Sequence, residues 1–201
     1  DPSYAKKVFK LLGPELPYEY VEPIGKALKG LVQNKNTASL LTQIEDSKVA
    51  GNINFHLANY GVRVGDWQLA ARHAALVPEK HVRSWHAKFI LSLAEYQNGH
   101  KDKAVALEDD ILENAPTSDK MVQELLTVVS LNLGRMYFQD RKFKEDKDAF
   151  VKVSKENPLW IQSLHELGWS QVQAGDFEGA IGNMYSIQSP YFQNVFKPES
   201  F

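Results

Sequence analysis

The apolar residues of this chain recur at helical spacing from about residue 50 onward, in runs that end at short polar turns. The turns are Gly65-Asp66, Gly99-His100, Arg141-Lys142 and Gly175-Asp176. We expect no strands here, because no run shows the strict apolar–polar alternation of a half-buried strand. A glycine or polar pair at such a turn interrupts a helix, so each run divides into two helices. The pattern therefore predicts a series of helical hairpins.

The hairpins recur with a period of 34 residues. A leucine and a small residue precede each turn, and the small residues are Ala58, Ser92, Gly134 and Gly168. Their separations are 34, 42 and 34, and the excess of eight falls near residues 117–124, where we expect a longer first helix. The small residue lets the second helix of the hairpin approach closely. Since one hairpin cannot bury its apolar face alone, the hairpins must stack, which predicts an all-α solenoid.

This pattern resembles the tetratricopeptide repeat, a helical hairpin with Leu-Gly, Tyr, Ala and Pro at fixed places in 34 residues. The third unit matches the family at Leu133, Gly134, Tyr137, Phe150 and Pro158. It departs from the family at Asp146, where a small Ala is usual. The fourth unit matches at Leu164, Leu167, Gly168 and Ala180, with Gln171 at the Tyr place. The resemblance implies a right-handed α-α superhelix of about four helical hairpins plus an N-terminal helical region.

The resemblance also implies a division of the chain. Residues 51–194 are expected to form four repeats, at about 51–84, 85–126, 127–160 and 161–194. Residues 1–50 are expected to form a helical cap region, with helices near 4–12, 18–32 and 37–44, although an independent binding segment is the alternative. Residues 195–201 look like the start of a further, truncated repeat, because Pro198 suits the first turn of a helix.

A narrower resemblance concerns residues 175–199. Gly182-Asn183, the Ser-Pro-Tyr-Phe turn at 189–192 and the Phe-Lys-Pro-Glu motif at 196–199 look like stretches of large repeat proteins from predatory and gliding bacteria. Such proteins are commonly envelope-associated, which implies the bacterial periplasm or association with the outer membrane. The cytoplasm is the alternative, because a chain without cysteine suits either compartment.

Composition excludes several function classes. The chain has 23 basic and 25 acidic residues and a formal net charge of −2, which provides no basic surface for nucleic acid. No run approaches the roughly 18 apolar residues that span a bilayer, so we expect no direct membrane insertion. No phosphate loop or Gly-x-Ser-x-Gly elbow occurs, and no two of the six histidines lie four residues apart. We expect neither enzymatic activity nor a metal or cofactor site.

In the tetratricopeptide family, the first helix of each repeat lines a concave groove. Carried over to this chain, that rule predicts a partner-binding set of Phe55, Asn59, Phe89, Leu93, Tyr96, Asn132, Arg135, Phe138, His165 and Trp169. Further places on the same helices are Asn52, His56, His86, Ile90, Val128, Leu131, Gln162, Glu166 and Val172. The carboxylate clamp known in this family is not matched, because Phe55 stands where the clamp needs Lys and Ile90 where it needs Asn.

The predicted groove is rich in aromatic residues and has Arg135 as its main cation. Aromatic side chains contribute much of the energy at interfaces, so the expected guest is a partly apolar protein or peptide segment, extended or helical. The predicted function is therefore an interaction scaffold or adaptor. Three alternatives stay open: burial of the rings within the solenoid, a segment of residues 1–20 in the groove, and a self-assembling, homo-oligomeric envelope module.

Overall fold

The computed structural model describes residues 7, 9, 11–33 and 46–189. Within these ranges every regular element is an α-helix, and none is a strand. The chain divides into two compact units, residues 1–115 and 116–201. The predicted helix near 37–44, the motifs after residue 189 and most of the predicted helix near 4–12 lie outside the described residues.

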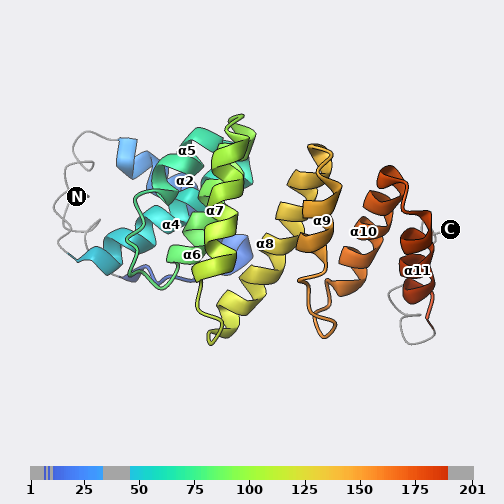
Figure 1. The fold of residues 1–201 in the computed structure, drawn as a ribbon. Helices are drawn as coiled ribbons and strands as arrows, with labels where there is room; N and C mark the ends of the chain where they lie inside the picture. The colour runs from blue at the N-terminus through green and yellow to red at the C-terminus, as the bar shows by residue number, and fades with distance from the viewer. Residues whose placement is uncertain (1–6, 8, 10, 34–45, 190–201) are drawn as a thin grey trace. The chain divides into compact units, whose positions relative to one another are not determined.

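The described part of the chain forms four helical hairpins preceded by one N-terminal helix (Figure 1). Unit 1 contains α2 (Tyr18–Gln33), α4 (Ser47–Val64), α5 (Trp67–Ala74), α6 (Ser84–Gln97) and α7 (Lys101–Asn114). Unit 2 contains α8 (Lys120–Gln139), α9 (Phe143–Phe150), α10 (Trp160–Ala174) and α11 (Phe177–Ile187). Within each unit, helices that follow one another in the chain pack together, which confirms the predicted all-α solenoid. The 20 residues of α8, against 14 in α6, confirm the longer helix expected near the excess of eight.

The four turns inside the hairpins share one backbone arrangement. The N–H of the second turn residue donates to a carbonyl five residues earlier, at 2.8 or 2.9 Å, in the pairs Asp66–Gly61, His100–Glu95, Lys142–Tyr137 and Asp176–Gln171. The first turn residue is left-handed, with φ of 72° at Gly65, 87° at Gly99, 58° at Arg141 and 80° at Gly175. Glycine adopts this conformation without steric cost, and Arg141 is the one other residue to adopt it in the described ranges.

Aspartate side chains fix where several of these helices begin. An aspartate at the N-cap accepts a hydrogen bond from a free backbone N–H of the first turn, which satisfies a donor that the helix itself cannot pair. Four helices begin in this way, with the caps Asp46 before α4, Asp66 before α5, Asp119 before α8 and Asp176 before α11. The helix boundaries are therefore set locally.

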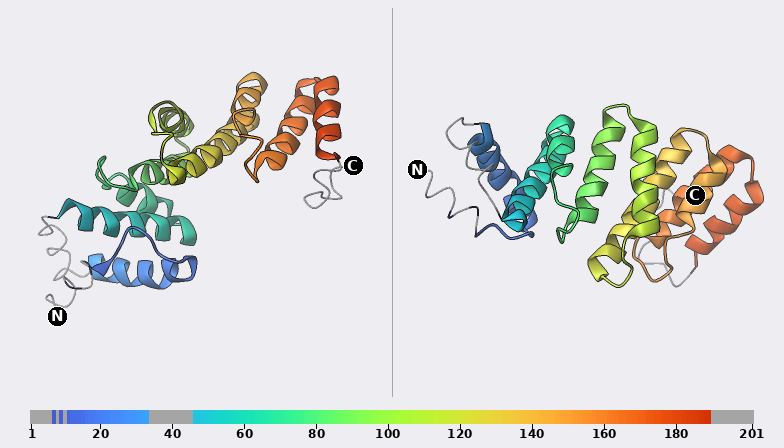
Figure 2. Two further views of the ribbon diagram at one scale, coloured as in Figure 1. Left: turned by 90° about the horizontal axis from the view of Figure 1, so that it is seen from below. Right: turned by 60° about the vertical axis from the view of Figure 1, so that its left-hand side comes forward.

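In unit 1, α2 lies alongside α4 (Figure 2). The two helices approach closely at Gly25, where an added Cβ would lie 2.3 Å from the Cβ of Tyr60. The core between them also includes a residue from the N-terminal segment, and its buried members are Phe9, Leu28, Val49, Ile53 and Leu57. The next layer, between the α4–α5 hairpin and α6, is built mainly from alanines, with Phe55 and Ile90.

In unit 2, the small residues of the Leu-Gly pairs are sites of close helix approach, as predicted. An added Cβ on Gly134 would lie 2.6 Å from Cε1 of Phe150, and one on Gly168 would lie 2.4 Å from Cε of Met184. Phe150 also packs in the core between the two hairpins of unit 2, which includes Leu131, Val153 and Leu167. The glycines therefore allow the second helix of each hairpin to lie against the first.

Asp146, at the place where the repeat pattern usually has alanine, is fully buried. Its Oδ2 accepts a hydrogen bond from the hydroxyl of Ser170 on α10, whereas its Oδ1 has no hydrogen-bond partner among the described residues. Burial raises the pKa of this carboxyl above its ordinary value, and the hydrogen bond from Ser170 offsets only part of that effect. The departure from the family pattern therefore places a polar group in the core.

Candidate partner-binding site

A pocket of about 500 Å³ opens among the helices of unit 2. It is lined by Arg135 and Phe138 of α8, Phe150 of α9, and His165, Glu166 and Trp169 of α10. Arg135, Phe138, His165 and Trp169 belong to the predicted partner-binding set, and Glu166 to the further places. Phe150, which the repeat pattern assigns to packing alone, completes the lining.

Helix geometry explains why these side chains meet. Arg135 and Phe138 are three residues apart on α8, so they lie on one face of that helix. His165 and Trp169 are four apart on α10 and likewise share a face. Because α9 packs against both α8 and α10, the two faces lie on either side of Phe150. The lining is therefore mostly aromatic, with charged groups supplied by Arg135 and Glu166.

Arg135 and Glu166 form a two-bond ion pair at the pocket. The Nε and Nη2 atoms of Arg135 lie 2.7 and 2.5 Å from Oε2 and Oε1 of Glu166, and Gln162 donates a further hydrogen bond of 3.0 Å to Oε1. Donating these hydrogen bonds to Glu166 raises the pKa of Arg135, so the guanidinium stays charged. The pair is partly exposed, so it adds little to stability, but its fork geometry holds the guanidinium plane in one orientation.

Trp169 is the most exposed aromatic residue of the pocket, with 52% of its surface accessible. Its ring meets that of His165 edge to face, with centroids 6.5 Å apart. Phe138 makes a similar contact with Phe143 of α9, at 6.2 Å. Tryptophan is enriched among the residues that dominate binding energy at protein interfaces, and here one is held in place beside an apolar pocket.

The other members of the predicted set lie elsewhere. Phe55 is buried in the α4–α6 layer, and Asn59 donates a 3.3 Å hydrogen bond to the carbonyl of Phe55 in its own helix. The remaining members are half-buried and do not line the pocket of unit 2; they are Phe89, Leu93 and Tyr96 on α6 and Asn132 on α8. Their part in partner binding stays a prediction.

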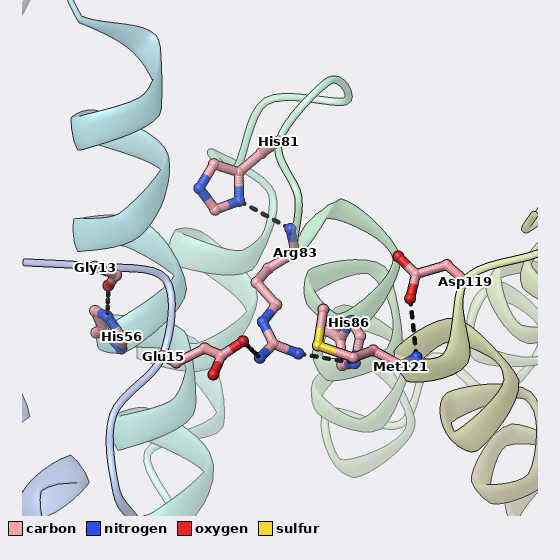
Figure 3. A network of polar contacts seen from close by, with 8 residues as sticks. All are labelled: Gly13, Glu15, His56, His81, Arg83, His86, Asp119 and Met121. Carbon is pink, nitrogen blue, oxygen red and sulfur yellow. Dashed lines mark hydrogen bonds and ion pairs between the residues drawn. The ribbon is translucent and has the colours of Figure 1, made fainter.

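In unit 1, a segment of the chain itself covers part of the predicted binding face. Asn52 Nδ2 donates to the carbonyl of Leu12 at 2.7 Å. His56 Nε2 lies 2.7 Å from the carbonyl of Gly13, and because a carbonyl only accepts, this nitrogen carries the proton (Figure 3). Both donors are buried and lie one turn apart on α4. Leu12 and Gly13 therefore occupy two of the further places predicted on α4, and whether the rest of residues 1–20 fills the groove stays a prediction.

Arg83, in the connection before α6, holds the next part of the same segment. Its Nη2 lies 3.0 Å from Oε1 of Glu15, and its Nη1 donates to Nε2 of His86 at 3.2 Å (Figure 3). The guanidinium carbon is 5.9 Å from the ring centroid of Phe55. The sequence contains no signal for this role, because Arg83 lies in a connection that the repeat pattern leaves unspecified.

His81 links the two parts of this polar arrangement. Its Nδ1 accepts from the backbone N–H of Arg83 at 3.1 Å, so its Nε2 carries the proton and donates to Oδ1 of Asn52 at 2.9 Å. Burial lowers the pKa of both His56 and His81, and the charge of Arg83 lowers both further. Both rings are therefore held neutral near pH 7, each with one defined donor.

Across residues 11–33 and 46–189, no three histidine, aspartate or glutamate side chains gather in a set that could hold a metal ion. No helix of the described chain has the length and apolar character needed to cross a bilayer.

Comparison with known proteins supports the fold. No family model matches the chain, and no curated protein matches it in sequence. Among solved structures, it is similar to the apo form of RapI, with a TM-score of 0.66 and 13% identity over 85% of this chain and 69% of that chain. At this identity the likeness concerns architecture alone. The chain thus shares a helical-repeat fold with RapI.

Proposed function

We propose that this chain is a protein-interaction scaffold that binds a partner segment at the pocket of unit 2, without turnover. One observation supports the proposal above others: Arg135, Phe138, His165 and Trp169, predicted from sequence as binding residues, line one apolar pocket. Its volume of about 500 Å³ lies within the range usual for binding sites, roughly 300–1,000 Å³.

The charges at the pocket indicate the chemistry of the partner. Glu166 already neutralises Arg135 through two hydrogen bonds, so an acidic partner group would have to displace a carboxylate that is well placed. An apolar side chain meets no such competitor, and it would cover the exposed ring of Trp169. The partner is therefore a segment that inserts an aromatic or large aliphatic side chain, with its polar backbone beside the ion pair.

The test uses photo-crosslinking followed by a binding measurement. A benzoylphenylalanine at position 169 should crosslink the partner in cells, whereas the same residue at position 20 should not. Tyr20 of α2 is an aromatic residue with 51% of its surface exposed, close to the 52% of Trp169, and it lies outside the pocket, which makes it a matched control. With the partner purified, Trp169→Ala should weaken binding by about 30-fold or more, as hot-spot residues do, and Tyr20→Ala should leave it unchanged. Equal affinity of the two folded variants would contradict the proposal.

A second candidate function is self-assembly in an envelope complex. Phe177, Ile181 and Tyr185 are spaced four residues apart on α11, share one face and are all exposed. Sedimentation over a hundredfold concentration range should show association that Ile181→Glu removes; a monomer throughout would refute this candidate. The envelope location rests on the resemblance of residues 175–199, and recovery of the native protein in the cytoplasmic fraction of its cells would refute it.

A further inference from the structure

We propose that residues 12–15 are a tethered occupant of an exchangeable peptide site in unit 1, and that the site takes an extended acidic segment of a partner protein in their place. The peptide site is defined here by Asn52, His56 and Arg83. It is separate from the pocket of unit 2, so the inference does not depend on the function proposed above.

The site requires an occupant, because its donors are buried. Asn52 and His56 are almost inaccessible to solvent and donate to two successive backbone carbonyls, those of Leu12 and Gly13. If the segment leaves and nothing replaces it, both donors lose their acceptors, which is unfavourable for buried polar groups. Since the segment contributes only backbone carbonyls to these two contacts, any extended segment can supply the same acceptors.

The ion pair at the site is incomplete, which favours a better acidic ligand. Glu15 contacts Arg83 through Nη2 alone, and its side chain is 66% exposed, against 15% for that of Arg83. The Nε of Arg83 is buried and has no hydrogen-bond partner among the described residues. A carboxylate that reached Nε and Nη2 together would form the two-bond fork that Glu15 does not form.

The segment is held by its polar contacts and by the packing of Leu12. Gly13 and Glu15 are exposed, whereas Leu12 is half-buried and packs against the core that contains Phe9, so release of the segment gives up that contact as well. Phe9 upstream is buried in the core with α2 and α4, and α2 begins just downstream at Tyr18. These two anchors keep the released segment close to the site. Residues 12–15, the occupant from the same chain (the cis segment), therefore lower the apparent affinity of the site for a partner, because the partner can bind only while the cis segment is released.

The test uses the full chain and a fluorescein-labelled peptide with the sequence of residues 11–16, Leu-Leu-Gly-Pro-Glu-Leu. Glu15→Lys places a repelling charge beside Arg83 and should release the cis segment. Measured by fluorescence anisotropy, the peptide should then bind at least about tenfold more tightly than to the wild type. Glu22→Lys is the matched control: it makes the same charge change on α2, where Glu22 pairs with Arg63, and should bind as the wild type does.

Arg83→Ala in the Glu15→Lys chain should abolish binding, and a peptide with Gln in place of Glu should bind more weakly. Equal affinity of Glu15→Lys, Glu22→Lys and wild type would overturn the proposal, as would binding that survives Arg83→Ala. If circular dichroism shows that Glu15→Lys disturbs the fold, the wild type labelled with ¹⁵N-histidine replaces it. Excess peptide should then shift the Nε2–H signal of His56 saturably, and an unmoved signal would refute exchange at this site.

Discussion

The close approach of helices at the Leu-Gly places can be tested with two alanine substitutions that differ only in the neighbour of the new methyl group. At Gly134, the added Cβ would meet three ring atoms of Phe150 at 2.6, 2.8 and 2.8 Å. The ring is buried in the core of unit 2 and cannot swing away. At Gly168, the new Cβ would meet only the terminal methyl of Met184, at 2.4 Å, and every other neighbouring atom lies at 3.9 Å or beyond. A methionine terminus can rotate aside, because its side chain is flexible.

The expected magnitudes follow from two opposing effects. Replacing glycine with alanine inside a helix stabilises it by about 0.8–1 kcal/mol, and this gain applies to both sites. Overpacking a rigid core neighbour costs about 1–3 kcal/mol, and this cost applies mainly at Gly134. We expect Gly134→Ala to lower the free energy of unfolding by up to about 2 kcal/mol, whereas Gly168→Ala should leave it unchanged or raise it by up to about 1 kcal/mol.

Urea denaturation followed by circular dichroism at 222 nm measures both variants against the wild type, and an unchanged slope shows that the comparison concerns stability. The double variant Gly134→Ala/Phe150→Leu should recover part of the loss, because the smaller side chain makes room for the methyl group. If the two alanine variants shift the midpoint equally, or if Gly134→Ala is the more stable of the two, the assignment of close ring contact at Gly134 is wrong.

Two further predictions concern residues that depart from the repeat pattern. Asp146→Asn should raise the free energy of unfolding at pH 8 by about 1 kcal/mol, because the buried carboxyl must ionise with one oxygen unpaired. Since its pKa is raised in the folded state, Asp146 favours the fold below the ordinary carboxyl pKa and loses that contribution as pH rises through the folded value. Melts between pH 4 and 8 should therefore show a slope in the wild type that the asparagine variant lacks; parallel profiles would contradict this. Arg141→Gly should stabilise the chain by about 0.5–1 kcal/mol, because its left-handed φ of 58° is strained for a residue with a Cβ. Gly175→Ala, at the equivalent turn, should do the opposite in the same urea titration, and a destabilised Arg141→Gly variant would refute the argument.

Much of the architecture follows from local signals in the sequence. The alternation of apolar runs and polar turns predicts the four hairpins because helix formation and interruption depend on residues within a few positions of one another. The spacing of the Leu-Gly pairs likewise predicts the close contacts at Gly134 and Gly168. Glycine has no side chain, so its presence at these two places already indicates that another helix can approach there. The length of α8 follows from the eight extra residues near 117–124.

The make-up of the binding surfaces was decided by tertiary structure. Arg135 and Glu166 are 31 positions apart, and only the packing of α8 and α10 on α9 brings them into a two-bond pair. The contacts of Leu12 and Gly13 with α4 leave no trace in the sequence, because every residue has a backbone carbonyl and no residue type marks the one that is bound. Arg83 is likewise unremarkable until a carboxylate from another part of the chain lies beside it. The sequence by itself therefore determined the helices and their stacking. Which surfaces are open and which are already occupied was decided only by the tertiary structure, because the contacts that decide it join residues far apart in the sequence.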